Sequence, residues 1–472
     1  MAASRIEHDL IGDLAVPQDV LYGVHTERAR KNFQITGTPI SSLPDLVIAL
    51  ASIKSAAAQA NADLGLLSLE KRDAIVQACE EIRAGQWHDH FVVDVLQGGA
   101  GTSTNMNANE VICNRALEIL GHQRGEFQYL HPNEDVNMAQ STNDVYPTAI
   151  RLALWFAIGR LQGSMQVLCD SFARKATEFA DVLKIGRTQL QDAVPMTLGQ
   201  ELGTFVTMLQ GDQARLSGSA VLMQQINLGG TAIGTGITTH PEYARLASAH
   251  LARISGVPVT LADDLICATQ DCGDFVQVSG MLKQIAVRLS KICNDLRLLS
   301  SGPRAGLGEI NLPAVQAGSS IMPGKVNPVI PEVVSQIAFE VFGTDATVTF
   351  AAEAGQLQLN AFEPVIACAL LRSFKHLGNG CITLAENCVD GMTANRELLG
   401  RNLECSISLV TALNPVIGYK MATAVAAEAF QKGLNVRDVV LARQLLSAEE
   451  LDDLLQPAEL LQPREYPEVA QR

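Results

Sequence analysis

Residues 152–161 read Leu-Ala-Leu-Trp-Phe-Ala-Ile-Gly-Arg-Leu, and this stretch decides the fold class. Apolar side chains stand at almost every position, so an α-helix here would be apolar on nearly every face. We therefore expect it to be buried on all sides, inside a bundle of other helices. The helical pattern extends over 144–183, about forty residues, or roughly 60 Å at the usual rise per residue.

Four more long helical patterns follow this one. They run over 195–228, 274–300, 331–352 and 363–399, and two of them begin with a proline, which a first helical turn tolerates. Sustained alternation typical of strands is missing from the sequence, apart from small pieces such as 257–261. Helices of this length exceed what one monomeric domain can hide, so we expect an all-α protein whose five-helix bundle is shared between subunits.

The pattern divides the chain into three expected domains. Residues 1–143 combine shorter helices with glycine-dotted loops and form an N-terminal mixed domain, and residues 144–399 form the central long-helix bundle. Residues 400–472 are shorter in pattern and more polar, with helical pieces at 415–432 and 447–455, and form a small C-terminal helical domain.

Composition excludes several classes of partner. The formal net charge of −15 argues against binding to nucleic acid or to an anionic membrane surface. No uncharged apolar run approaches the length of a membrane span, and the N-terminus resembles no signal peptide. Ten cysteines stand singly, without a Cys-x-x-Cys pair, as in a reduced chain. We expect a soluble cytoplasmic protein.

A second informative stretch, residues 318–328, reads Gly-Ser-Ser-Ile-Met-Pro-Gly-Lys-Val-Asn-Pro. Its glycines and prolines predict a loop that can close over a ligand. It is not a phosphate-binding loop, because five residues separate its glycines and Val326 replaces the required Ser or Thr. Two hydroxyls, an ammonium and an amide on one loop suit a site that removes a proton beside a carboxylate, with either serine as the base.

The stretch resembles the signature of the aspartase/fumarase superfamily, whose members add or eliminate small groups across the double bond of fumarate. The resemblance implies that Ser319 is the catalytic base and that Ser320, Lys325 and Asn327 bind a substrate carboxylate. It also implies an all-α, three-domain fold in a homotetramer whose bundles merge, with each site drawn from three chains.

Three further polar segments, 98–107, 140–144 and 186–195, resemble the other signature segments of the superfamily. By themselves such Gly, Ser, Thr and Asn runs more often build turns. The resemblance carries substrate contacts onto the following residues: Thr102, Ser141, Thr142, Asn143, Thr188 and Gln189. Fumarases, and some aspartases, carry a histidine at the last of these positions, whereas glutamine can hydrogen-bond an amino group but cannot shuttle protons.

Three remaining motifs are not expected to take part in catalysis. Residues 131–137 resemble a peripheral dicarboxylate site of fumarases, but we expect a structural loop there. The glycines of 229–236 have the wrong spacing for a dinucleotide loop, and no strand signal precedes them. His88 and His90 lack an apparent third metal ligand, so two exposed histidines are the expected reading.

The resemblance, strongest toward the aspartate-deaminating branch, implies reversible deamination of L-aspartate to fumarate and ammonia through an aci-carboxylate intermediate. One alternative is a class II fumarate hydratase acting on malate and fumarate. The other is a non-catalytic structural relative, as in the eye lens. The expected partner is a small dicarboxylate substrate, and no cofactor is expected. Some members of the superfamily are activated by magnesium, but no cluster of ligands in this sequence supports a magnesium site.

Overall fold

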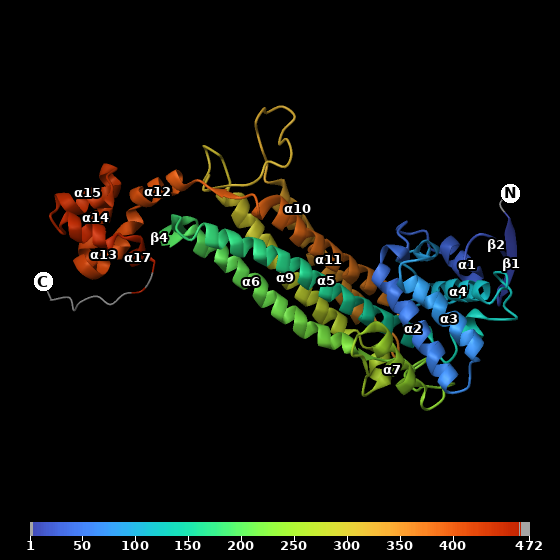
Figure 1. The fold of residues 1–472 in the computed structure, drawn as a ribbon. Helices are drawn as coiled ribbons and strands as arrows, with labels where there is room; N and C mark the ends of the chain where they lie inside the picture. The colour runs from blue at the N-terminus through green and yellow to red at the C-terminus, as the bar shows by residue number, and fades with distance from the viewer. Residues whose placement is uncertain (1–2, 462, 464–472) are drawn as a thin grey trace. The chain divides into compact units, whose positions relative to one another are not determined.

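The computed structural model describes residues 3–461 and 463, and most of them are helical (Figure 1). The first helices are α1 (Val24–Asn32), α2 (Pro44–Asp63), α3 (Leu69–Arg83) and α4 (Thr102–Ile119). The five long helices are α5 (Thr142–Glu178), α6 (Leu198–Ala220), α9 (Gly273–Leu299), α10 (Val329–Glu353) and α11 (Glu363–Leu384). Between α6 and α9 lie α7 (Tyr243–Ser255) and α8 (Leu265–Gln270). The all-α fold class is confirmed.

The C-terminal helices are short, and strands occur only as pairs in the described part of the chain. The helices are α12 (Arg396–Cys405), α13 (Val410–Ile417), α14 (Tyr419–Lys432), α15 (Val436–Ala442), α16 (Ala448–Leu454) and α17 (Pro457–Leu460). The antiparallel pairs are β1 (Ser4–Asp9) with β2 (Gly12–Pro17), β3 (Leu183–Thr188) with β4 (Gln191–Thr197), and β7 (Ile310–Asn311) with β8 (Thr393–Ala394). Strands β5 (Gln225–Ile226) and β6 (Thr260–Leu261) pair in parallel.

The chain divides into two compact units. Unit 1 comprises Met1–Gly163, Asp212–Ala286 and Ile337–Gly378, and unit 2 comprises Ser164–Gly211, Val287–Gln336 and Asn379–Arg472. Each boundary falls inside one of the five long helices. The three-domain division therefore stays a prediction, and the end of its third domain, 462 and 464–472, lies outside the described residues.

In unit 1, helix α2 forms the centre of the N-terminal helices and packs against α3, α4 and α7. Its alanines let neighbouring helices approach closely, and most of its residues are buried. On α5, Leu152, Ala153 and Leu154 are fully buried. The expectation of burial on every side is wrong for one face, however, because Trp155 and Phe156 are half-buried and residues 159–160 are exposed in the single chain.

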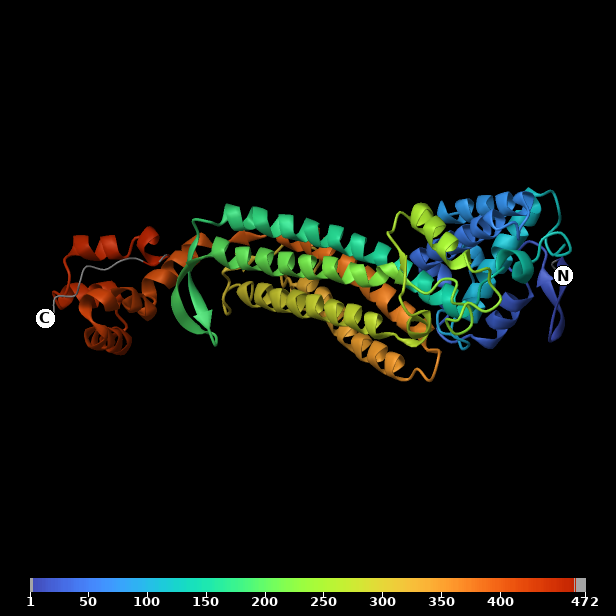
Figure 2. The ribbon, with the colours of Figure 1, turned by 90° about the horizontal axis from the view of Figure 1, so that it is seen from below.

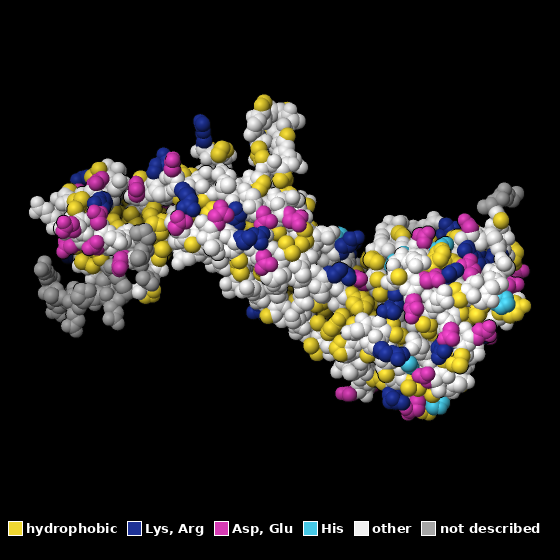
Figure 3. Space-filling view, viewed as in Figure 1, with side chains coloured by type: hydrophobic (Ala, Val, Ile, Leu, Met, Phe, Trp, Pro, Cys, Tyr) yellow, Lys and Arg dark blue, Asp and Glu magenta, His cyan; other side chains and the backbone are white. Residues whose placement is uncertain are grey.

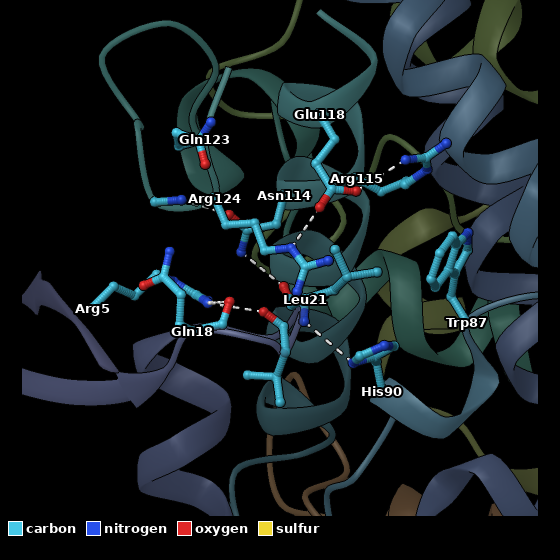
Figure 4. Close-up of polar contacts among 12 residues, drawn as sticks. Arg5, Gln18, Leu21, Trp87, His90, Asn114, Arg115, Glu118, Gln123 and Arg124 are labelled. Carbon is cyan, nitrogen blue, oxygen red and sulfur yellow. Dashed lines mark hydrogen bonds and ion pairs between the residues drawn. The ribbon is translucent and has the colours of Figure 1, made fainter. Parts of the chain in front are cut away.

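Polar side chains fix the entry to the first helix. The Leu21 N–H donates to Nδ1 of His90 at 3.2 Å, and its carbonyl accepts from Nδ2 of Asn114 at 2.7 Å (Figure 4). His88 is half-buried as well, with Nε2 2.8 Å from the Ile82 carbonyl. Burial lowers the pKa of His90 below its usual value. The expectation of two exposed histidines is therefore wrong, since both sit in the structure as hydrogen-bonding groups.

Two of the predicted long helices have different bounds from those expected. The helix predicted over 195–228 begins only at Leu198, because 191–197 pair with β3 in a hairpin, and it ends at Ala220. The helix predicted over 363–399 ends at Leu384, since Thr393–Ala394 pair with Ile310–Asn311. The C-terminal helices pack around their own small core, which includes Leu413, Val425, Val436, Val440 and Leu451. No helix in the described ranges is long and apolar enough to cross a membrane.

The structure predicts a stability contrast between two helical glycines of unit 2. A Cβ at Gly199, in the first turn of α6, would clash with the Ala176 carbonyl oxygen and lie 2.8 Å from Cα of Ala180. Because these are backbone atoms that cannot turn aside, Gly199→Ala is expected to destabilise the protein by about 1–3 kcal/mol in urea unfolding.

The matched control is Gly400→Ala in α12, where an added Cβ would meet nothing within 4 Å. Alanine there is expected to be neutral or to stabilise by up to about 1 kcal/mol, because glycine is a poor helix former. Equal unfolding midpoints for the two variants would contradict the proposed backbone contact between α5 and α6.

Candidate functional site

The first predicted substrate segment forms the N-terminus of α4. Gly99 and Gly101 both adopt left-handed backbone, with φ +89°, and Thr102 is the first helical residue. A Cβ on Gly101 would lie 2.5 Å from the Tyr146 ring, so only glycine fits this close approach. The Thr102 side chain is exposed, and its hydroxyl donates to the Gly99 carbonyl at 2.7 Å. The segment is a rigid turn that presents Thr102 to solvent.

The second predicted segment forms the N-terminus of α5, where Asp144 organises the backbone. Its carboxylate is fully buried and accepts from the Ser141 N–H at 3.0 Å, the Gly229 N–H at 2.9 Å and the Thr231 N–H at 3.0 Å. Burial raises the Asp144 pKa to about 6, against the three N–H donors, which lower it. Residues 141–143 are thereby tied to the glycine-rich loop 229–239.

The two segments meet within unit 1 through side-chain amides. Nδ2 of Asn105, on α4, donates to the Thr142 hydroxyl at 3.2 Å and to Oδ1 of Asn137 at 3.2 Å. Nζ of Lys54, on α2, donates to Oδ1 of Asn137 at 2.8 Å and to Oε1 of Gln140 at 2.9 Å. The Lys54 side chain is completely buried, and burial lowers its pKa to about 7. A lysine that is only partly protonated at neutral pH therefore lies behind the 140–142 segment.

The Asn143 side chain connects its segment to the loop 229–239. Its Nδ2 donates to the Ala232 carbonyl at 2.7 Å, and its own carbonyl accepts from Nδ2 of Asn227 at 3.0 Å. Its Oδ1 remains the atom that it can offer as a hydrogen-bond acceptor. Asn143 therefore both fixes the loop 229–239 and carries an acceptor suited to an ammonium group.

A buried carboxyl group lies near the base of the first segment. Glu363, the first residue of α11, is 3% exposed, and burial raises its pKa to about 8, opposed by the Arg151 charge. Arg151 itself is paired with Asp274 at 2.7 Å. Burial, and to a lesser extent the ionised form of Glu363, raises the pKa of Tyr146, whose ring supports Gly101. Glu363 is therefore a protonated acid near neutral pH.

The third predicted segment is the β3–β4 hairpin of unit 2 (Figure 2). Thr188 pairs with Gln191, so Gln189 and Leu190 form a two-residue turn. Both turn residues have positive φ, +54° and +60°, as in the mirror-image turns that suit hairpin twist. Left-handed backbone costs about 1–2 kcal/mol for a residue with a side chain. The hairpin holds this strained tip so that Thr188 and Gln189 are exposed.

A buried carboxylate fixes the base of this hairpin. Glu309 lies in the connection between α9 and α10 and is ion-paired with Lys184 at 2.7 Å and with Arg187 at 2.6 Å. Lys184 also pairs with Glu201 at 2.6 Å. Both Lys184 and Glu309 are only 1% exposed. Within unit 2, the hairpin is thus joined to the connection that carries Ser319.

The fourth segment, residues 318–327, is a loop closed at its neck; the connection around it extends away from the helices (Figure 1). The Gly318 N–H donates to the Lys325 carbonyl at 2.9 Å, and Nδ2 of Asn327 donates to the Gly318 carbonyl at 2.7 Å. A Cβ on Gly318 would collide with the Lys325 carbonyl. Asn327, predicted to bind substrate, therefore also closes the loop.

The two adjacent serines of this loop have different surroundings. Oγ of Ser319 accepts from the Ile321 N–H at 3.2 Å and from the Met322 N–H at 3.0 Å. In the described part of the chain, no such donor is directed at Ser320, which is exposed. Backbone N–H groups stabilise negative charge on oxygen, so the structure favours Ser319 over Ser320 as the residue that can lose its proton.

Two lysines of different character accompany the predicted residues, one in each unit. Lys325 is exposed on the loop, with no ion pair in the described residues, whereas Lys54 is buried. On the face drawn in Figure 3, acidic and basic side chains are otherwise interspersed. The loop at the top of that view carries hydrophobic side chains, in keeping with Ile321 and Met322, which are 83% and 48% exposed.

The predicted residues therefore fall into two groups. Unit 1 holds Thr102 and 141–143, and unit 2 holds Thr188, Gln189 and the loop 318–327. Sequence reasoning missed Lys54, Asn105, Asp144, Glu309 and Glu363. A signal existed for Lys54, which is the one charged residue between the two ends of an alanine-rich helix. Among residues 3–461 and 463, no group of three or more His, Cys, Asp or Glu side chains is placed to hold a metal ion.

Comparisons with known proteins place this site in context. A family model described as a lyase matches residues 12–343, and one described as the fumarase C C-terminus matches residues 409–462. An aspartate ammonia-lyase of Pseudomonas aeruginosa is 57% identical over 99% of this chain and 99% of its own. An aspartate ammonia-lyase of Escherichia coli K12 is 53% identical over 97% of this chain and 96% of its own.

Solved structures agree with these relatives. A crystal structure of fumarate lyase:delta crystallin from Brucella melitensis bound to cobalt has a TM-score of 0.95 at 54% identity, covering 98% of this chain and 100% of its own. A class II fumarase from Schistosoma mansoni has a TM-score of 0.92 at 35% identity, covering 97% of this chain and 99% of its own.

Glu363 leads to a prediction about stability and pH. The unfolded chain loses this proton near pH 4.5, whereas the folded protein keeps it up to about pH 8. Because the pKa of Glu363 is raised in the folded state, its bound proton stabilises the folded protein. This stabilisation is complete below pH 4.5, the pKa in the unfolded chain, and it is lost as the pH rises to about 8. The expected loss from Glu363 is about 1.4 kcal/mol per pH unit across that window.

The measurement compares urea unfolding of the parent and of Glu363→Gln from about pH 6 to about pH 9, so that all other titrating groups cancel. Glutamine keeps the shape without a titrating proton. The parent is expected to lose stability relative to the variant up to about pH 8, and the difference should then level off. Parallel curves across the range would mean that Glu363 is already ionised in the folded state.

Proposed function

This chain belongs to the aspartase/fumarase superfamily of lyases, and we propose that it catalyses the reversible deamination of L-aspartate to fumarate and ammonia. The observation that carries the chemistry is the pair of backbone N–H groups directed at Oγ of Ser319. The similarity to aspartate ammonia-lyases, which extends over nearly the whole chain at 53–57% identity, supports the choice of substrate.

In this proposal, the Ser319 alkoxide takes the proton from Cβ of aspartate. A serine is a weak base unless its alkoxide is stabilised; the two N–H donors supply that stabilisation, and we propose that the Lys325 ammonium on the same loop adds to it. The electron pair of the broken C–H bond spreads onto the β-carboxylate as an aci-carboxylate. Lys325, Asn327, Ser320 and the 141–143 segment would hold that carboxylate, because preorganised donors stabilise charge that develops in the transition state.

Loss of the amino group completes the reaction. The electron pair returns to form the carbon–carbon double bond, and the C–N bond breaks with its electrons leaving on nitrogen. The ammonium group already carries its protons and departs as neutral ammonia, so it needs orientation rather than protonation. Gln189 and Thr188 at the hairpin tip, Thr102 and Oδ1 of Asn143 are the groups that we propose orient it.

We further propose that the chain works as a homotetramer in which these groups meet between subunits. Apolar side chains of the long helices are exposed in the single chain, which supports association: Val167 is 40% exposed, Val287 51%, Phe339 59% and Phe350 74%. Surfaces of this kind on long helices are typical of subunit contacts. Figure 3 shows some of the hydrophobic side chains that lie at the surface of one face.

The proposed reaction needs no cofactor, because the leaving group and the carboxylates are handled by hydrogen bonds and lysine charges. All ten cysteines are free. This state suits a reducing compartment, and we propose the cytoplasm.

Replacing the base gives the first test. Ser319→Ala is expected to lower kcat by a factor of about 10² or more, because only the transition state loses an interaction. A non-reactive dicarboxylate such as succinate should still bind with similar affinity in calorimetry. Ser320→Ala is the matched control and should keep more activity, with its main effect on KM. If Ser320→Ala were the inactive variant of the two, the base would be Ser320.

The leaving group gives the second test. A hydratase must protonate a departing hydroxide, for which an imidazole at position 189 is useful, whereas glutamine can orient an ammonium at any physiological pH. Fumarate absorbance should therefore appear far faster from aspartate than from malate. Gln189→His should keep part of the aspartate activity without becoming an efficient hydratase. Rapid turnover of malate by the parent, with aspartate inert, would overturn the proposed substrate.

A further inference from the structure

Unit 1 contains a cavity of about 350 Å³ that the proposed reaction does not use. One face of α11 forms its largest wall, because the lining residues of this helix recur every three or four positions, as one helical stripe does. They are Val365, Cys368, Ala369, Arg372, Lys375 and His376. The cavity is at the small end of the size range of sites for small molecules.

Positive charge gathers at one end of this cavity. Arg372 and Lys375 lie one helical turn apart, and His376 follows directly. Glu340, on α10, pairs with Arg372 at 3.1 Å and with Nδ1 of His376 at 2.7 Å. The Glu340 carboxylate therefore offsets one of the two fixed positive charges, which belong to Arg372 and Lys375. The ammonium of Lys375 is exposed and makes no hydrogen bond or ion pair among the described residues, so it can pair with a ligand.

The remaining lining mixes apolar side chains with hydroxyl groups. The apolar lining residues are Leu43, Val95, Leu96, Val365 and Ala369, and the hydroxyl-bearing ones are Thr36, Thr38, Ser42, Thr344 and Thr347. Apolar surface together with an ammonium and a guanidinium suits a ligand with a short hydrocarbon body and a single anionic head, because each part of the ligand then meets a matching surface.

We propose that this cavity binds a small organic carboxylate, with its carboxylate at Lys375 and Arg372 and its hydrocarbon body against Leu43, Val95 and Leu96. A planar carboxylate fits the fork of an arginine, and the lysine adds a point charge. Inorganic phosphate matches the site less well, because it has no apolar part to contact the apolar lining residues. None of the lining residues belongs to the substrate segments, so the proposal stands apart from the proposed activity.

The test uses the full-length protein and n-butyrate as probe, followed by saturation-transfer NMR titration. Butyrate is expected to bind the parent more tightly than inorganic phosphate, and n-butylammonium, which has the same body but the opposite charge, should not bind. Tighter binding of phosphate than of butyrate, or equal binding of butylammonium, would overturn the proposed ligand class. Absence of butyrate binding would overturn the site itself.

Substitutions then locate the bound butyrate. Lys375→Gln should weaken binding roughly tenfold, because a charge-assisted hydrogen bond is lost, and Lys375→Glu should abolish it. The matched control is Lys420→Gln on α14, which replaces another exposed lysine and should leave the affinity unchanged. Both lysines are exposed, so neither change is expected to unfold the chain. Equal affinity in the parent and Lys375→Gln would place butyrate elsewhere and overturn the proposal.

Discussion

The hydrogen bonds to the buried carboxylate of Asp144 are the constraint on which the polar part of unit 1 depends. A carboxylate removed from water is costly unless it is satisfied, and here three backbone N–H groups from two segments satisfy it. Because those donors belong to Ser141, Gly229 and Thr231, the start of α5 and the loop 229–239 cannot move independently. The proposed substrate groups on 141–143 are therefore held by main-chain geometry, which side-chain rotation cannot disturb.

Unit 2 also contains a buried carboxylate, but its partners are positively charged side chains rather than backbone N–H groups. Glu309 is buried against Lys184 and Arg187, so removing any one partner would leave an uncompensated charge in the interior. The strained tip at Gln189 and Leu190 persists because the hairpin is fixed at its base. A residue held in an unfavourable backbone conformation keeps its side chain exposed without depending on neighbouring side chains for support. The buried ion pairs of Glu309 at the base of the hairpin thus help to hold the residues at its tip in position.

The sequence predicted the parts of this architecture that repeat, and missed those that depend on pairs of distant residues. The long helices α5, α9 and α10 were found within a few residues because their apolar periodicity is local information. The start of α6 was predicted too early, since Pro195 suits a first helical turn equally well, and only its pairing with Ile185 makes it part of a strand. The loop 318–328 was predicted from its glycines and prolines. The distinction between Ser319 and Ser320, however, required the positions of two N–H groups.

Charge explains why the missed residues matter. A chain of net charge −15 repels a dicarboxylate on average, so attraction must be created locally. Lys325 supplies an exposed charge that water screens, whereas Lys54 lies in a dry interior, where burial lowers its pKa to about 7 and where its protonated form acts more strongly. The Lys54 ammonium donates hydrogen bonds to amide oxygens of Asn137 and Gln140 rather than to a carboxylate. These amides satisfy its hydrogen bonds without cancelling its charge, which is offset only in part by the nearby Asp144 carboxylate. A carboxylate in place of either amide would hold the lysine as firmly but would cancel the rest of its charge.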